Sequence, residues 1–554
     1  MKIDVIDLSI IGQSLLATAK EMGQKLVNSA YSPIIREARD ASTAILDRNG
    51  QIVAQAEMIP IQLGSMGTTL RPCLDRFPIE TLTEGDFFIN NHPYHGGQHL
   101  QDVFIFTPVF HEGQLICFCG STAHHLDIGG RKSINRSSLD LYQEGVVFPP
   151  MKLRFDTDWH EDSPLRQLFC ANIRIPEQTI GDFEAQFAAN ALGEQRILEL
   201  ARRYGPDAIS SAMAHLIDYS EAVLRASIRK LPVGSFEGED CLDDCGVDGK
   251  PLTVRVKVTV NNDTLSLDYA GTSGQFDDNM NAPLASSLAA AFSCVKALLV
   301  PSDVPFNEGT LRPVSVAFPS GSFVNPITPA AVGARMEACY RIYCATMKAM
   351  ARALPSVAIS SGFDASIVTR FAHRLADGRL KIAHEVHGGG FGAAPTEDGA
   401  DGIAASLSNV TNTPVEAMDM EYPHIRIREY ALAIDSCGYG KFRGGLGLKR
   451  SYEVLTDGVE FSCFGDRFSV RPDGLAGGLA GSLAKCQVAR EGQTTAFDHH
   501  RPAVMRKGDV VTVCTSGGAG HGDVRERSAE RIASDLADGY VTELAVETAM
   551  KTSL

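Results

Sequence analysis

The stretch from Val103 to Gly120 constrains the fold of this chain more than any other. Two runs of β-branched, aromatic and other apolar residues, Val103 to Phe110 and Gln114 to Gly120, are separated by the short polar segment from His111 to Gly113. Such runs around a turn that contains glycine are typical of a β-hairpin. The sequence therefore predicts two antiparallel strands at this place.

The expected turn also sets a register for the hairpin. If Glu112 and Gly113 are the central turn residues, the numbers of cross-strand partners sum to about 225. Gln101 then lies opposite His124, and Asp102 lies beside this pair, since cross-strand neighbours are about 5 Å apart. We therefore expect polar side chains to meet at the open end of the hairpin.

Histidines are concentrated in the same region, where six of the fifteen lie between His92 and His125. In the expected register His99, Asp102 and His124 converge. Two imidazoles and one carboxylate with open positions suit a divalent transition metal such as zinc, manganese or iron. The alternative is a polar strand end whose histidines cap loops and bind nothing, and spacing alone leaves both open.

Composition limits the classes of protein that need considering. The chain has 554 residues, of which 44% are hydrophobic and 21% charged, which predicts a globular protein of two to four domains. A net charge of −16 argues against nucleic-acid binding. The start MKIDVIDLSI lacks the pattern of a secretory signal, and the thirteen cysteines contain no CxxC pair. We expect a reduced, cytoplasmic location.

Hydrophobic periodicity predicts a mixed α/β protein of the α+β type, with a helix-rich N-terminal half that carries the hairpin and a strand- and glycine-rich C-terminal half. Expected helices are Ile6 to Ser29, Ile180 to Ala201, Pro206 to Arg229, Leu284 to Leu299 and Arg335 to Leu354, and an expected strand pair is Leu252 to Val260 with Thr264 to Tyr269. We divide the chain into domains at 1–230, 231–355 and 356–554. The apolar stretch Leu284 to Val300 is interrupted by serines and a lysine, so it predicts a packed helix and no membrane span.

Glycine-rich segments of the C-terminal half raise the question of nucleotide binding. The strand Val510 to Cys514, the loop SGGAGHG and a helix expected from Val524 to Ala537 follow the order of a phosphate-binding loop, but the lysine of that loop is missing. No dinucleotide-binding fingerprint is present. We therefore interpret the glycines as tight turns near a buried surface and expect no nucleotide on this chain.

Several segments resemble the hydantoinase B/oxoprolinase family, in the family's order and over nearly the whole chain. They are REARDASTAILDRNGQIVAQAEMIPIQLGSM, HPYHGGQHLQDV, AHHLDIGG, LYQEGVVFPPMKL, ANIRIPEQTIGDFEAQFAAN, FDDNMNAP, NEGTLRP, TNTPVE, FRGGLGL and GLAGG. The family includes subunits of ATP-dependent hydantoinases and lactamases, part of eukaryotic 5-oxoprolinase, and subunits of ketone carboxylases. The resemblance implies an actin-like A subunit that binds ATP with Mg and phosphorylates the substrate, and a B subunit, this chain, that completes the reaction.

The resemblance also implies site residues. The related subunit of acetone carboxylase binds a metal through a histidine, an aspartate three residues later and a histidine twenty-five residues after the first, which here are His99, Asp102 and His124. We add Asp40 as a fourth ligand or an orienting carboxylate. Where relatives commonly read NDPYHGG this chain has His92, and we expect this difference to alter either the shape of the substrate or the hydrogen bonds around the metal ligands.

Three further polar residues are candidates for proton transfer. His125 and Asp127 follow His124 closely, and Glu144 lies in the LYQEG segment. They either act as general acids and bases or only orient the metal ligands. For Arg335 and Glu337 we expect pairing on the surface of a helix.

The function that the resemblance implies is hydrolysis of a cyclic amide: a hydantoin, 5-oxoproline or a simple lactam. Phosphorylation of the amide oxygen turns a resonance-stabilised ring into a better electrophile, and a metal then activates water or the substrate. One alternative is a subunit of a ketone carboxylase of the acetone or acetophenone type, which acts on an enol phosphate. The other is a non-catalytic scaffold for the ATP-binding partner.

Overall fold

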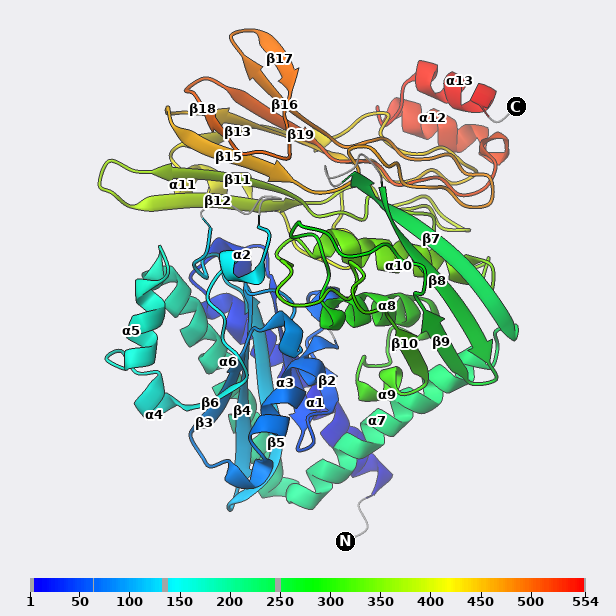
Figure 1. Cartoon of the computed structure of the whole chain (residues 1–554). Helices are drawn as coiled ribbons and strands as arrows, with labels where there is room; N and C mark the ends of the chain where they lie inside the picture. The colour runs from blue at the N-terminus through cyan, green and yellow to red at the C-terminus, as the bar shows by residue number, and fades with distance from the viewer. Residues whose placement is uncertain (1–3, 63, 132–137, 245–250, 553–554) are drawn as a thin grey trace.

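The structure, a computed structural model, describes residues 4–62, 64–131, 138–244 and 251–552. Four β-sheets and the helices around them account for the described chain (Figure 1). The fold is mixed α/β, as predicted, and the sheets are antiparallel except where β9 and β10 pair in parallel. The first half contains more sheet than we predicted, because the hairpin is the centre of a six-stranded sheet.

The six-stranded sheet has the order β2-β1-β5-β4-β3-β6. Its strands are β1 (Ala41–Asp47), β2 (Ile52–Gln55), β3 (Asp86–Asn90), β4 (Asp102–His111), β5 (Gln114–His124) and β6 (Met151–Arg154). Helices α1 (Val5–Ser29) and α6 (Pro176–Tyr204) contact the sheet, and α3 (Ser65–Arg76) packs on β3 and β4. Phe104 and Phe106 of β4 join one apolar cluster and Val103 and Ile105 another, as the alternation of a strand buried on both faces requires.

The predicted hairpin is confirmed as β4 and β5. Glu112 has φ of 50° and Gly113 has φ of 78°, which is the left-handed backbone that a two-residue hairpin turn needs. Next to this turn Phe110 pairs with Leu115, so the predicted sum of 225 is correct there.

Further from the turn the predicted register is wrong by one residue. A β-bulge opposite Val109 and Phe110 inserts an extra residue, Ile116, in β5, and beyond it Asp102 pairs with His124, in place of the predicted Gln101. The bulge brings the carboxylate of Asp102 directly opposite the imidazole of His124. The convergence of the two side chains is thus closer than the predicted register implied.

The central part of the chain forms a second sheet in the order β10-β9-β8-β7. Its strands are β7 (Gly234–Asp244), β8 (Pro251–Asn261), β9 (Thr264–Asp268) and β10 (Val314–Ala317), and the predicted strand pair is confirmed as β8 and β9. The predicted helices are confirmed as α7 (Pro206–Ile228), α8 (Leu284–Leu299) and α10 (Met336–Ala351), and α10 packs on both β7 and α8. Within the described ranges, no helix has the length and apolar character needed to cross a membrane.

The C-terminal part forms two sheets, which lie at the top of Figure 1. The first has the order β12-β11-β15-β18, from β11 (Ile367–Arg374), β12 (Leu380–His387), β15 (Val459–Phe464) and β18 (Ala503–Met505). The second has the order β13-β14-β19-β16-β17, from β13 (Ile425–Leu432), β14 (Leu448–Val454), β16 (Lys485–Arg490), β17 (Gln493–Ala496) and β19 (Val510–Cys514). The helix expected from Val524 to Ala537 is a short 3-10 turn followed by α12 (Ala529–Ala537), and α13 (Glu543–Thr552) ends the described chain.

The glycine-rich segments differ from the turns that we predicted. They run extended and side by side, and they hydrogen-bond through their backbones, as from Gly438 N to Gly518 O (2.7 Å) and from Gly518 N to Gly445 O (2.9 Å). A Cβ on Gly444 would lie 1.9 Å from the carbonyl oxygen of Gly518. These glycines are therefore needed for close approach between backbones, and SGGAGHG is one of the packed segments.

One large apolar core connects the three parts of the chain. It includes Ile45 of β1, Leu267 of β9, Ala338 of α10 and Phe371 of β11. Each of the four sheets lies within one of the ranges 1–230, 231–355 and 356–554. We therefore propose that the chain is organised into these three parts. The core that they share packs them into one body.

Candidate metal site

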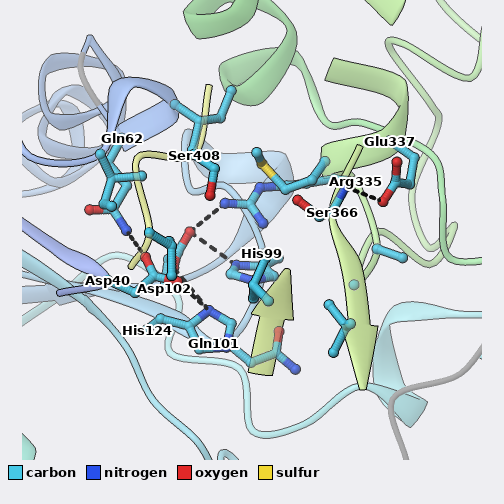
Figure 2. Close-up of a pocket in the computed structure, with 18 of the residues that line it drawn as sticks. Asp40, Gln62, His99, Gln101, Asp102, His124, Arg335, Glu337, Ser366 and Ser408 are labelled. Atoms are coloured by element: carbon cyan, nitrogen blue, oxygen red, sulfur yellow. Dashed lines mark hydrogen bonds and ion pairs between the residues drawn. The ribbon is translucent and has the colours of Figure 1, made fainter. Parts of the chain in front are cut away.

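His99, Asp102 and His124 come together at the open end of the hairpin (Figure 2). His99 precedes β4, Asp102 is the first residue of β4 and His124 is the last of β5. His99 Nδ1 lies 3.0 Å from Asp102 Oδ2, and His124 Nδ1 lies 3.6 Å from Asp102 Oδ1. One ligand atom from each of the three lies within 4.8 Å of the others, so the residues form a candidate metal-binding triad.

The donor atoms of the triad fit a divalent metal ion. His99 Nδ1 and Asp102 Oδ1 are buried, and among the described residues neither makes a hydrogen bond outside the triad. Buried polar atoms are nearly always satisfied in folded proteins, so buried ligand atoms that contact only one another are what a site for an additional ion requires. Two imidazoles and a carboxylate are the donors that zinc, manganese and iron accept.

Asp40 lies beside the triad and is not one of its three members. The carbonyl of Asp40 accepts a hydrogen bond from the backbone N–H of His124 (3.1 Å) because β1 pairs with β5 at this point. Its Oδ2 is 3.8 Å from His124 Nδ1, and its Oδ1 accepts from Gln62 Nε2 at 2.9 Å. Burial raises the pKa of Asp40 to about 6, although the neighbouring His124 opposes the shift.

Arg335 and Glu337 are placed differently from our prediction of a pair on a helix surface. Both are buried at the start of α10. Arg335 donates to Asp102 Oδ2 at 2.6 Å, and Glu337 accepts from the backbone N–H of Ser366 at 2.9 Å. The prediction is wrong because the helix surface in question is covered by the hairpin on one side and by the C-terminal part on the other.

The charges around the triad keep His99 neutral and Asp102 ionised. Burial raises the pKa of Asp102, but His99 and Arg335 outweigh this effect and hold the carboxyl ionised. Burial and the charge of Arg335 lower the pKa of His99 to about 3, so its imidazole is neutral. Burial lowers the pKa of His124, but its hydrogen bond to Asp102 and the charge of Asp40 raise it overall. A neutral imidazole beside an ionised carboxylate is the form in which both coordinate metals.

The triad opens into a cavity of about 80 Å³ between the hairpin, the start of α10 and the C-terminal part. The far wall comes from β11, β12 and the loops near them, through Ser366, Val368, His384, Val386 and Ser408. The His384 ring lies 6.1 Å from the His124 ring, measured between centroids. We did not predict His384 as a site residue, because the only signal is a histidine in an alternating strand pattern.

His125 faces away from the cavity, as expected for the neighbour of His124 at the end of a strand. Its Nε2 is 2.9 Å from Gln186 Oε1, and its ring packs against Phe183 of α6, with 4.4 Å between centroids. Burial lowers its pKa to about 4. The structure therefore places His125 in the packing between β5 and α6.

Asp127 and Glu144 lie behind the triad cavity. Asp127 accepts hydrogen bonds from the backbone N–H groups of Gly129 (3.0 Å) and Ile175 (2.9 Å) and pairs with Arg174 (3.3 Å). Glu144 accepts from the N–H groups of Val332 (3.0 Å) and Gly333 (2.7 Å). Burial raises the pKa of Glu144 to about 8. Neither residue borders the triad cavity, but Gly333 does.

His92, the departure from the family pattern, caps a short turn. Its Nδ1 accepts from the N–H of Tyr94 at 3.2 Å, and its ring lies against His95, with 4.4 Å between centroids. It does not border the triad cavity. An effect of His92 on the substrate would therefore act through the loop that leads to His99.

Comparison with known proteins identifies the family of this chain. The Hydantoinase B/oxoprolinase family matches residues 4–524. The chain is 32% identical to the B subunit of a putative D-/L-hydantoinase from Pseudomonas sp. over 98% of its own length and 94% of that protein's. The chain therefore belongs to the Hydantoinase B/oxoprolinase family, as its sequence motifs predict.

Two solved structures share the fold. The crystal structure of the ATP-dependent caprolactamase from Pseudomonas jessenii superimposes with a TM-score of 0.88 at 25% identity, and the match covers 98% of this chain and 95% of that one. Nucleotide-free acetone carboxylase superimposes with the same TM-score at 18% identity, which shows the fold alone. That match covers 79% of the acetone carboxylase chain.

Proposed function

We propose that this chain is the B subunit of an ATP-dependent amidohydrolase that opens a cyclic amide, namely a hydantoin, 5-oxoproline or a lactam. Its partner in the proposed hetero-oligomer is an actin-like A subunit that binds ATP and Mg and phosphorylates the amide oxygen. The observation that carries the proposal is the buried triad of His99, Asp102 and His124, whose ligand atoms face a cavity large enough for a small ring. The hydantoinase and caprolactamase relatives support the class of substrate.

Each site residue has a role in this proposal. A zinc, manganese or iron ion held by His99, Asp102 and His124 would supply Lewis-acid activation of the electrophile or of water. Arg335 keeps Asp102 ionised and fixes its orientation, and Asp40 orients His124 as an additional carboxylate. These contacts fix the donor atoms before a substrate arrives, which is what a site for hydrolysis needs.

The predicted proton-transfer residues divide into two groups. Glu144 keeps a role as a general acid, because burial leaves most of its carboxyl protonated near neutral pH. His125 and Asp127 act as positioning residues that hold the end of β5 and the loop after it.

The alternative of a ketone carboxylase has one observation in its favour, the fold shared with acetone carboxylase. The share of each chain that is covered favours hydrolysis, because this chain accounts for 95% of the caprolactamase chain but for 79% of the acetone carboxylase chain. A non-catalytic scaffold would leave the buried ligand atoms of His99 and Asp102 without a purpose.

The test is to co-express the chain with an actin-like ATP-binding subunit and to measure ATP hydrolysis and ring opening with a panel of hydantoins, lactams and ketones. We expect ring opening of a cyclic amide that depends on ATP and not on bicarbonate. His99→Ala should abolish it, whereas His111→Ala, at the turn of the same hairpin, should not. Turnover that requires a ketone and bicarbonate would establish the carboxylase instead, and full activity of His99→Ala without metal would refute the role of the triad.

A further inference from the structure

Arg370 is a buried arginine without a hydrogen-bond or ion-pair partner among the described residues. The residue is 6% exposed, and within the described ranges it donates no hydrogen bond and forms no ion pair, while its Nε is buried and unsatisfied. Burying a charged side chain costs several kcal/mol unless an opposite charge compensates it, and Asp127 and Glu460 attract Arg370 without coming within ion-pair distance. A fold that retains such a group indicates that an anion compensates it when a ligand is bound.

The position of Arg370 relates it to the triad. Arg370 of β11 pairs with His384 of β12, so both side chains project from the same face of the sheet. Ser366 and Val368 precede Arg370 at alternate positions and border the triad cavity, as does His384. Arg370 is therefore the next residue along the wall that faces the triad.

Arg370 borders a second cavity of about 30 Å³ that adjoins the triad cavity. Gln101 and Gly333 border both cavities. A single buried water needs about 10–15 Å³ of cavity volume. The second cavity therefore accepts two or three oxygen atoms of a bound group but not a second ring. Its volume and its position suit the end of a molecule whose reacting carbon lies in the triad cavity.

The other charged groups of the second cavity leave it positive. Asp127 forms an ion pair with Arg174 and accepts hydrogen bonds from backbone N–H groups, so Arg370 feels the charge of Asp127 only from beyond ion-pair distance. Glu144, with its pKa raised to about 8 by burial, is mostly neutral near neutral pH. Arg174 and Arg370 both border the cavity against one aspartate, Asp127, so these lining residues carry more cationic than anionic charge.

We propose that Arg370 is the binding group of an oxyanion subsite that takes the phosphoryl group of the activated substrate. The guanidinium binds phosphoryl oxygens through paired, charge-assisted hydrogen bonds, and the adjoining triad cavity holds the ring. The assignment rests on the proposed function, since only a phosphorylated substrate brings a phosphoryl group to this chain. It names the part of the substrate that the subsite recognises and explains why the fold tolerates a buried arginine.

The test measures binding of inorganic phosphate to the full-length chain by calorimetry, with Arg370→Gln and Arg379→Gln compared with the unchanged chain. Arg379 lies in the same β11–β12 hairpin, and its side chain is 72% exposed, so Arg379→Gln controls for the loss of one positive charge. We expect Arg370→Gln to weaken phosphate binding about tenfold or more, as the loss of a charge-assisted hydrogen bond predicts. Arg379→Gln should leave the dissociation constant within about twofold.

A second measurement separates a binding role from a structural one. Because Arg370 has no hydrogen bond or ion pair to lose among the described residues, Arg370→Gln should unfold at the same temperature as the unchanged chain or at a higher one. A lower unfolding temperature with unchanged phosphate affinity would overturn the proposal, and so would the lack of saturable phosphate binding by the unchanged chain. Tighter binding of acetate than of phosphate would also overturn it, because the subsite would then recognise a carboxylate.

The failure of this proposal can be told from the failure of the proposed function. If phosphate binding depends on Arg370 but the chain opens no cyclic amide with any partner, the subsite is supported and the amidohydrolase is refuted. Ring opening that proceeds equally well in Arg370→Gln, with unchanged phosphate affinity, would retain the amidohydrolase and refute the subsite.

Discussion

Glu144 combines two opposing influences on a single carboxyl group. Burial disfavours its ionised form, while the N–H groups of Val332 and Gly333 favour it, and burial dominates, which raises the pKa from 4.5 to about 8. In the unfolded chain the carboxyl ionises above about pH 4.5. Between these two pH values the folded chain binds the proton more tightly than the unfolded chain, so stability falls as the pH rises.

We predict that Glu144→Gln removes this dependence. The free energy of unfolding of the unchanged chain should fall, relative to that of the variant, by up to about 5 kcal/mol between pH 4.5 and 8. Glu144→Gln also loses one acceptor for the two N–H groups, a constant cost of about 1 kcal/mol that does not vary with pH. Denaturant unfolding at several pH values measures the difference.

The control for this prediction is Glu161→Gln, since Glu161 is exposed. Its unfolding curves should follow those of the unchanged chain at every pH. A difference between Glu144→Gln and the unchanged chain that stays constant from pH 4.5 to 8 would contradict the assignment of a raised pKa to Glu144.

Individual site residues differ in how far the sequence could predict them. His99, Asp102 and His124 could be predicted, because one hairpin and its adjoining loop bring all three together. Arg335 and Arg370 could not, since Arg335 contacts Asp102 and Arg370 borders a cavity with Gln101, in each case more than 200 positions away in the chain. An arginine in an amphipathic helix or an alternating strand is usually on the surface, and the sequence contains no signal of its burial.

At the level of single strands, the sequence predicts where a strand lies but not always how it pairs. The turn of the β4–β5 hairpin could be predicted from its glycine and its length, but the bulge opposite Val109 and Phe110 could not. A bulge changes which residues pair without changing which residues are apolar. Strand boundaries were therefore close to those observed, whereas the pairing at the metal site was displaced by one residue.

The glycine-rich segments allow a prediction at the same scale. Gly444→Ala should destabilise the chain by about 3 kcal/mol, because the added methyl would lie 1.9 Å from the carbonyl oxygen of Gly518 and a backbone cannot move aside as a side chain can. Gly274→Ala is the matched control, since its Cβ meets nothing nearer than 3.9 Å. Its stability should stay within about 1 kcal/mol of the unchanged chain.

Denaturant unfolding of both glycine variants measures the effect. A chain with Gly444→Ala that unfolds like Gly274→Ala would show that the extended segments have room between them. If Gly444→Ala does not fold in ordinary buffer, both glycine variants can be unfolded in the presence of sulfate, which favours the compact state. Their free energies of unfolding can then still be compared.

The candidate site is a property of the whole molecule. The triad comes from the six-stranded sheet, Arg335 from the start of α10, and His384 and Arg370 from the sheet of the C-terminal part. The sequence predicts most of the elements that supply these residues. It does not predict that the three parts close around one cavity, because that depends on contacts between residues far apart in the chain.

Since all three parts border the cavity, a metal bound there should stabilise the whole chain. At a free metal concentration of 100 times the dissociation constant, binding to the folded state alone adds about 2.7 kcal/mol. For a chain of 554 residues this corresponds to a rise of about 2 °C in the unfolding temperature. We therefore predict that chelation lowers the unfolding temperature and that added zinc, manganese or iron restores it.

Variants of two histidines in the same hairpin separate a specific site from general metal binding. His99→Ala removes one ligand of the triad, so its unfolding temperature should no longer respond to metal or chelator. His111→Ala, at the far end of β4, should respond as the unchanged chain does. Equal responses of both variants would mean that metal stabilises the chain from some other place, and the buried ligand atoms of His99 and Asp102 would then need a different ligand.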